Sequence, residues 1–347
     1  RMLAAHQQRH AGYRGLRFAE AEREIPASRT LTFLADVSPL PEEMSYVAAV
    51  DILDADGNSL ARQADPFRTY RFPWEGNNLG TSDHPIPPFE DVKPGRPGTR
   101  RLALWNRTLR FDDAGLPVSI TSGGAELLAG GPELSATVNG TPATLTPEED
   151  AFKWLQKHPG RMIGGGRGAL GPLTVGVRSE TEYDGMTTFT VRIDNNGEAV
   201  TVDDMRLAIA MPAAAAPVFV TKEMSATVNE FGATASEDGV FWDSYRLDPS
   251  AQIKGRFLPH LYLGDGERGL TYTAASDRGW MLDRSKPSTS LAREGDRIVF
   301  TLHLANAPFE LREPRELEFV LQAVPVKPLP PDYRHPWGHY SPPGYRG

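Results

Sequence analysis

Cysteine is missing from all 347 residues, which removes thiol catalysis, disulfide bonds and cysteine-ligated zinc from consideration. The net charge is −8 and no basic run or stripe occurs, so the sequence does not support nucleic-acid binding. The longest apolar stretch, around residues 207–220, is interrupted by Pro212 and Pro217 and is too short to span a bilayer. We therefore expect no nucleic-acid partner, no membrane span, no metal and no cofactor.

The first fifteen residues, RMLAAHQQRHAGYRG, are basic and polar and contain no apolar segment of the kind that signal peptides carry. They fit either a cut inside a longer protein or a start left by processing. We expect an exported bacterial protein that works in the extracellular space or the periplasm.

Short alternating segments dominate the rest of the chain, for example Thr30–Val37 and Ser45–Leu53. Period-two alternation is typical of half-buried strands. Turn sequences such as DG, NNG, EDG and REGD separate these segments, and the abundant glycine (33) and proline (30) are spread along the chain. The pattern predicts an all-β protein of sandwich type.

Composition divides the chain further. We expect an N-terminal arm at 1–15, a small β-domain at 16–72 that is either whole or incomplete, a Pro/Gly-rich linker at 73–99, and a large, supersandwich-like β-domain at 100–330. An irregular tail rich in Pro and Tyr follows at 331–347. Within the large domain, residues 148–160 are predicted to form a short helix, followed by a flexible stretch GGGRGALG.

The acidic loop between Leu53 and Leu60 can be interpreted either as a hairpin turn or as a calcium-binding loop. Asp-Gly between alternating runs is a strong hairpin signal, whereas Asp54, Asp56 and Asn58 are also residue types that bind calcium. The spacing does not fit an EF-hand, so we expect a plain turn.

No familiar catalytic signature is present: the sequence has no G-x-S-x-G elbow, H-E-x-x-H, P-loop or dinucleotide fingerprint. The acidic pairs, such as Asp203–Asp204 and Glu237–Asp238, sit in or beside turns, where carboxylates usually cap backbone amides. The catalytic residues of this chain are therefore unknown from sequence.

Aromatic residues next to polar ones are a better lead, because Trp and Tyr stack on sugar rings while neighbouring polar groups bond to hydroxyls. The alternative is that these rings lock the linker and the sheet edges onto the core. The candidate carbohydrate-binding residues are Trp74, Asn77, Asn78, Asp83, His84, Trp242, Tyr245, His260, Arg268, Asp277 and Trp280.

Four segments, in order along residues 70–330, resemble glycoside-hydrolase-like bacterial proteins related to glycoside hydrolase family 123. They are FPWEGNNLGTSDHPIPPFEDVK, LWNRTLRFDDAGLPVSITSGGAELLAG, FLPHLYLGDGERGLTYTAASDRGWMLD and ELEFVLQAVPVKPLP. The resemblance implies β-sandwich domains followed by a catalytic barrel with adjacent Asp and Glu residues. The sequence stops seventeen residues after Pro330, so we expect no barrel within it and carry over no catalytic residue.

The resemblance does identify motif positions without a known role. Their glycines are expected to hold tight turns, and Arg268 and Asp277 are expected either to pair with each other or to contact sugar. The shared positions are Trp74, Gly76, Asn77, Gly80, Asp83, Gly264, Asp265, Glu267, Arg268, Gly269, Ser276, Asp277, Gly279 and Trp280.

Three functions remain open. The first is a non-catalytic, carbohydrate-associated β-sandwich module that works with a catalytic barrel domain or another protein chain. The second is a stand-alone glycan-active enzyme, for which a concave sheet holding His260 and two carboxylates would be the signature. The third is a structural or assembly protein of the cell envelope that docks a partner through its aromatic tail.

Overall fold

The computed structural model describes residues 2–6, 40–54, 56–70, 72–74, 84–96, 98–222, 229–245, 257–283 and 285–328, with residues 2–6, 222, 229 and 230 described by their backbone alone. It divides the chain into two compact units, residues 1–81 and 82–347. Strands dominate the described residues of both units, and the only helix among them is a single 3-10 turn, η1 (Ala213–Ala215). The all-β prediction is confirmed.

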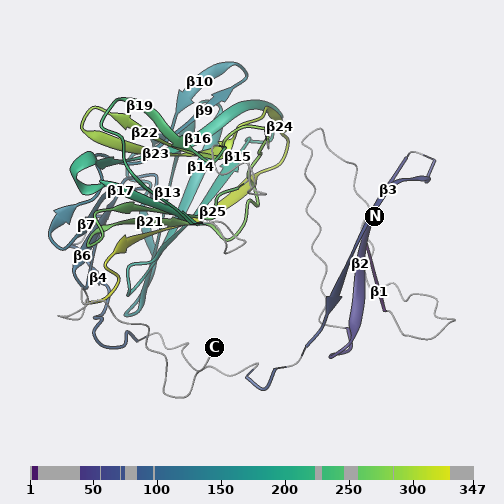
Figure 1. The fold of residues 1–347 in the computed structure, drawn as a ribbon, viewed down its shortest axis with the longest axis horizontal. Coiled ribbons are helices and arrows are strands. Elements are labelled where there is room, and N and C mark those ends of the chain that lie inside the picture. Colours follow the sequence, from purple (N-terminus) through teal and green to yellow (C-terminus); the bar gives the residue numbers. More distant parts are fainter. Residues whose placement is uncertain are drawn as a thin grey trace. The chain divides into compact units, whose positions relative to one another are not determined.

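The described residues of the first unit form an antiparallel sheet of three strands, in chain order (Figure 1). Its strands are β1 (Met2–His6), β2 (Ser45–Leu53) and β3 (Ser59–Arg68). The turn between β2 and β3 is a plain turn, as expected, since the Asp54 carboxylate accepts the backbone N–H groups of Asp56 (3.0 Å) and Asn58 (2.8 Å). Residues 2–6 lie within the predicted N-terminal arm and form a strand, which pairs with β2 from Tyr46 to Val50.

The second unit holds three antiparallel sheets, of which the smallest is a five-stranded meander. Its strands are β4 (Lys93–Pro94), β5 (Arg101–Leu104), β6 (Arg107–Phe111), β7 (Pro117–Ser122) and β8 (Ala125–Glu126). Strand β4 belongs to the segment predicted as linker, and the neighbouring Val92 is buried and donates its N–H to the Pro159 carbonyl at 2.7 Å. The last part of that segment is therefore packed into the second unit.

The seven-stranded sheet has the order β10-β9-β16-β23-β22-β19, with β24 paired to β16. Its strands are β9 (Glu133–Val138), β10 (Thr141–Thr144), β16 (Val200–Pro212), β19 (Gly239–Asp243), β22 (Thr289–Glu294), β23 (Arg297–Ala305) and β24 (Phe309–Leu311).

The ten-stranded sheet has the order β11-β13-β14-β15-β25-β21-β20-β17-β18, with β12 paired to β13. Its strands are β11 (Thr146–Pro147), β12 (Lys153–His158), β13 (Arg161–Leu170), β14 (Leu173–Glu182), β15 (Thr187–Asp194), β17 (Val218–Lys222), β18 (Asn229–Ala233), β20 (His260–Gly264), β21 (Gly269–Thr273) and β25 (Arg315–Val324).

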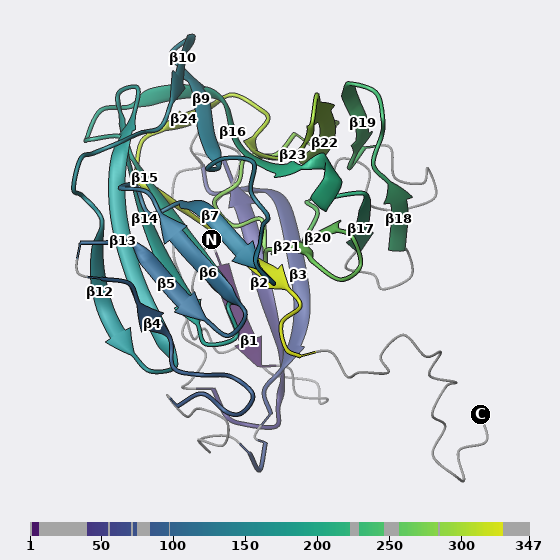
Figure 2. The ribbon, with the colours of Figure 1, turned by 90° about the vertical axis from the view of Figure 1, so that its left-hand side faces the viewer.

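One face of the ten-stranded sheet supplies the core. In Figure 1, β16, β22 and β23 lie above β21 and β25, and Tyr272 of β21 meets Phe300 of β23 with ring centroids 5.3 Å apart. Figure 2 shows the five-stranded meander beside β13 and β14, and its residues Leu109 and Phe111 belong to the same buried cluster as Phe319 of β25. The two smaller sheets therefore cover the inner face of the largest one.

The predicted helix at residues 148–160 is wrong, and the structure shows why. Phe152 and Trp154 alternate inward and pack on Phe111, with ring centroids 5.7 and 5.9 Å from it, while Lys153 and Leu155 point outward. This two-residue period suits strand β12 rather than a helix.

The prediction of a flexible stretch GGGRGALG is also wrong, because residues 164–170 lie in the ten-residue strand β13 and only Gly171 lies in the turn that follows. Its glycines are needed for close approach. A Cβ on Gly164 would lie 2.4 Å from the Phe152 ring, and one on Gly166 would lie 2.2 Å from the Asp113 carbonyl oxygen. Glycine inside a strand often marks such a contact between backbones.

A buried arginine connects the meander to the ten-stranded sheet. The Arg107 guanidinium donates to the carbonyl oxygens of Asp184, Pro325 and Val326, which follow β14 and β25. Burial lowers the pKa of Arg107 to about 10, so the side chain stays charged at neutral pH. Its hydrogen bonds satisfy three backbone carbonyl groups that lie beyond the strand ends and therefore outside the hydrogen-bond pattern of the sheet.

Gly166→Ala should destabilise the protein by about 1–3 kcal/mol, because the added methyl group meets backbone that has no room to move. Urea unfolding of the full chain measures this. Gly176→Ala is the matched control, since a Cβ there has no neighbour closer than 3.9 Å. Equal unfolding midpoints for the two variants would contradict the packing described.

Candidate functional site

Two of the predicted aromatic candidates belong to the core. Trp242 is 3% exposed and packs on Phe219, with ring centroids 5.7 Å apart. Trp280 is 4% exposed and meets Phe257 edge to face at 5.3 Å. Neither ring offers a face to solvent, so we do not retain them as platforms for sugar stacking.

Other predicted candidates are accessible but dispersed over the second unit. Tyr245 is exposed in the turn after β19, and His84 is exposed at the start of the unit. His260 begins β20 with its Nδ1 3.2 Å from Thr273 Oγ1. Asp277 is exposed in a turn in which its carbonyl oxygen accepts the Trp280 backbone N–H. The four residues thus come from four separate segments of the second unit.

Trp74 lies in the first unit at the end of an exposed aromatic ladder. It is 62% exposed and stacks on Phe72 at 4.8 Å, and Phe72 stacks on Tyr70 at 5.7 Å. The Arg68 guanidinium lies over the Tyr70 ring at 5.1 Å. Three neighbouring candidates, Asn77, Asn78 and Asp83, lie outside the described residues.

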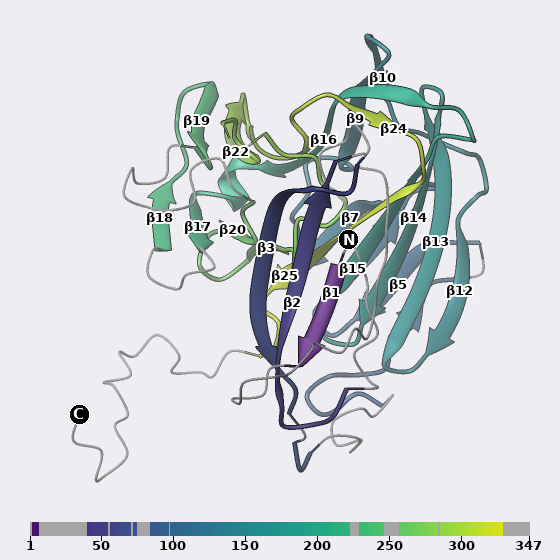
Figure 3. The same cartoon turned by 90° about the vertical axis from the view of Figure 1, so that its right-hand side faces the viewer.

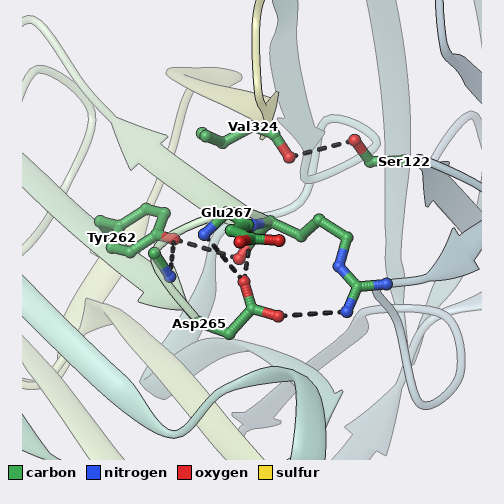
Figure 4. Close-up of polar contacts among 7 residues, drawn as sticks. Ser122, Tyr262, Asp265, Glu267 and Val324 are labelled. Atoms are coloured by element: carbon green, nitrogen blue, oxygen red, sulfur yellow. Dashed lines mark hydrogen bonds and ion pairs between the residues drawn. The ribbon is translucent and has the colours of Figure 1, made fainter. Parts of the chain in front are cut away.

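The motif residues of the β20–β21 turn hold one another (Figure 4). Asp265 Oδ1 accepts the backbone N–H groups of Glu267 (2.9 Å) and Arg268 (2.7 Å), and Tyr262 donates its hydroxyl to the Arg268 carbonyl oxygen at 3.1 Å. Arg268 pairs with Asp265 at 3.2 Å. Beside the turn, Ser122 donates to the Val324 carbonyl at 3.0 Å. These contacts give Asp265 and Arg268 a structural role, and the expected partner Asp277 is not the residue that Arg268 pairs with.

The outer face of the ten-stranded sheet carries a hollow of about 600 Å³, which the sequence did not reveal. It lies over β12 to β15 and β25, which run side by side in Figure 3, and the loop before β12 closes one side. Glycine forms its floor, and charged side chains form its walls. The lining residues are Glu148, Glu149, Asp150, Ala151, Lys153, Leu155, Gly165, Gly166, Arg167, Gly176, Val177, Arg178, Thr190, Arg192 and Glu316.

Strand register places the basic side chains of the hollow. Arg167 and Arg192 stand opposite Gly176 on its two sides, and Arg178 stands opposite Thr190 in the next row. Each alternates with an inward residue, such as Val177 and Val191, that packs into the core. The fold thus places three arginines, from the adjacent strands β13, β14 and β15, on the outer face of the ten-stranded sheet.

Carboxylates in and beside the hollow pair with these arginines. Glu148 binds Arg167 through two contacts of 2.6 and 2.7 Å, and these contacts lower the pKa of Glu148. Glu316 lies 3.3 Å from Arg192. Glu180, beyond the rim, lies 2.7 Å from Arg178. In these contacts the carboxylate oxygens act as hydrogen-bond acceptors from the arginines.

Glu182, at the end of β14, behaves differently. Burial raises its pKa, and the neighbouring charges of Asp184 and Glu180 raise it further. Asp184 is itself fixed by the backbone N–H of Met186 at 2.9 Å. His260 is not part of this group, since β21, β25 and β15 separate β20 from β14 by about 19 Å at ordinary strand spacing.

Across the described ranges, no three His, Asp or Glu side chains come together as a metal site. The same ranges contain no helix with the length and apolar character to cross a membrane.

The comparison with protein families gives one match, to glycoside hydrolase 123, third domain, over residues 98–230. This region of the chain is related to glycoside hydrolase family 123. The match includes the segment LWNRTLRFDDAGLPVSITSGGAELLAG and strands β13 and β14, which carry the floor of the hollow. The other three segments that resemble family 123 proteins lie outside it.

No curated protein matches the chain in sequence. Solved structures with partial likeness include an α-mannosidase from Enterococcus faecalis V583, with 12% identity and a TM-score of 0.41, over 81% of this chain and 32% of the mannosidase. An amine oxidase from Aspergillus nidulans has 9% identity and a TM-score of 0.36, over 82% of this chain and 63% of the oxidase. We base no conclusion on them, because both TM-scores are below 0.5.

Glu182→Gln should make the second unit more stable at neutral pH. The raised pKa means that the folded state holds the proton of Glu182 more tightly than the unfolded state does. The stability contributed by that proton is therefore present below the ordinary pKa and is lost as the pH rises through the raised one. At neutral pH the charged form is disfavoured in the fold, and glutamine removes this cost. Urea unfolding of both proteins from pH 4 to pH 8 measures the effect, and a midpoint at pH 7 that is lower in the variant would contradict it.

Proposed function

We propose that this chain is a non-catalytic β-sandwich module of a glycoside-hydrolase-like protein, and that it binds or supports a glycan. The observation that carries the proposal is the charged hollow on the open sheet face of a region related to family 123. Sugar hydroxyls both donate and accept hydrogen bonds, and alternating arginines and carboxylates offer both partners.

The state of the carboxylates supports a binding role. A glycosidase needs one carboxylic acid that holds its proton and a second group that acts as base or nucleophile. Glu148 and Glu316 in the hollow are paired with arginines at 2.6 and 3.3 Å, and the contacts with Arg167 lower the pKa of Glu148. They suit hydrogen bonding to hydroxyls better than proton donation.

The proposal includes a carbohydrate ligand and a catalytic barrel domain, or another chain that carries the catalytic groups. It also includes a localisation outside the cytoplasm, in the extracellular space or the periplasm of a bacterium. The family match to a domain described as the third supports a multidomain setting.

The exposed aromatic ladder of the first unit is proposed as a second contact with glycan. Trp74→Ala should weaken retention of the full chain on the polysaccharide that it binds, because the variant loses an exposed ring. A glycan array followed by affinity electrophoresis measures this. Phe231→Ala, which removes an exposed ring outside the ladder, is the control. Equal retention of the two variants would remove the ladder from the proposal, and a chain that binds no glycan at all would overturn the proposal itself.

One observation favours the alternative of a glycan-active enzyme, namely the raised pKa of Glu182 beside Asp184 and Glu180. A carboxylic acid with a raised pKa is what general acid catalysis requires. Incubation of the purified chain with the glycans that it binds, with sugar release as the readout, separates the two functions. We expect no release. Release that disappears in Glu182→Gln, while binding persists, would establish the enzyme.

A further inference from the structure

Gly176 is the one glycine on the floor of the hollow for which the fold gives no reason. Its φ lies outside the left-handed region, and the nearest atom to an added Cβ is the Gly166 carbonyl oxygen at 3.9 Å. Gly165 and Gly166 differ, since an added Cβ would lie 2.9 Å from Leu155 Cδ1 and 2.2 Å from the Asp113 carbonyl oxygen, respectively. Glycine inside a strand is destabilising relative to alanine, so the open space above Gly176 is not explained by packing.

The position of Gly176 suits a ligand that lies flat on the sheet. It occupies the middle of β14, and its cross-strand neighbours Arg167 and Arg192 rise on its two sides. A side chain at this position would stand between the side chains of Arg167 and Arg192 on the same face. Its absence leaves backbone as the floor and donors on both walls.

The charge of the lining indicates the class of ligand. Its four basic residues are Lys153, Arg167, Arg178 and Arg192, and its four acidic residues are Glu148, Glu149, Asp150 and Glu316. These charges balance, so the hollow offers no net attraction to an anion or a cation. Balanced donors and acceptors suit a neutral molecule with many hydroxyl groups.

An exposed leucine supplies the apolar contact that such a molecule needs. Leu155 is 61% exposed, and its side chain lies beside Gly165 within the hollow. A saccharide ring has an apolar C–H face and a polar edge, which match a leucine methyl group and the arginine–carboxylate walls. The volume of about 600 Å³ lies within the ~300–1,000 Å³ of ordinary small-molecule sites.

We propose that this hollow is the saccharide site of the module and that it takes a neutral saccharide. One ring lies over Gly176, with its hydroxyls bonded to Arg167, Arg192 and Glu316 and its C–H face against Leu155. The inference rests on the proposed function and narrows it to one site and one class of sugar.

Gly176→Val tests the site directly. Valine suits a strand and finds open space, so the urea unfolding midpoint should stay the same or rise. Affinity for a neutral oligosaccharide selected on the array should fall at least about tenfold by titration calorimetry. Thr188→Val is the matched control, because Thr188 lies on the same face of β15 as Thr190 and Arg192 but outside the hollow. The affinity of this control variant for the oligosaccharide should equal that of the wild-type chain.

Leu155→Ser gives a second test that does not depend on how valine is accommodated, since the exposed Leu155 contributes little to the core. The affinity of this variant for the oligosaccharide should also fall, while its urea unfolding midpoint should equal that of the wild-type chain. Full affinity in both variants, with a wild-type chain that binds glycan, would overturn this site and leave the proposed function standing. Selection of uronic or sulfated sugars over neutral ones would overturn the class of ligand. A wild-type chain that binds no glycan would overturn both proposals.

Discussion

In the second unit, both smaller sheets pack against the same face of the ten-stranded sheet. This constraint leaves the opposite, outer face of that sheet as the place where a binding site can form. Side chains such as Val177, Phe189 and Phe319 are buried on that inner face, and the residues between them are turned outward. The period of a strand leaves no alternative: once the inner set is fixed by burial, the outer set is fixed as well. The arginines of the hollow stand on the outer face because valines and phenylalanines occupy the inner one.

The packing of the five-stranded meander on the inner face of the ten-stranded sheet also brings two backbone segments into close contact. The loop at Asp113–Gly115 reaches β13 and β14, where the Arg167 N–H donates to the Asp113 carbonyl at 3.3 Å. Such contact is possible because Gly166 has no side chain. The glycine-rich sequence of β13 is thus a packing device, and it also gives the hollow a floor low enough to admit a ligand.

Much of the fold was predictable from the sequence, since alternation and turn chemistry are local. The all-β class and the hairpin at Asp54–Asn58 follow from such patterns. Strand β12 was not predictable in this way, because the inward direction of Phe152 and Trp154 is set by Phe111, which lies forty-one residues earlier. The strand nature of GGGRG depends on partners that are equally remote.

The candidate site was harder to predict for a related reason. Trp242 and Trp280 look like sugar platforms in the sequence, and only tertiary packing shows that their rings are covered. Arg178 and Arg192 look like ordinary solvated positions, and only the register of β13, β14 and β15 gathers them around Gly176. A signal did exist in the glycine at an outward position between valines in TVGVRSE, but its meaning requires knowledge of the space above it.

The measurement that tests this account most directly is an NMR titration of the full chain with a neutral oligosaccharide. The account predicts that amide shifts concentrate at Gly165, Gly176, Thr190 and Arg192 on the outer face and leave the β20–β21 turn unchanged. Shifts that avoid this face, or that centre on the turn at Asp265–Arg268, would contradict it.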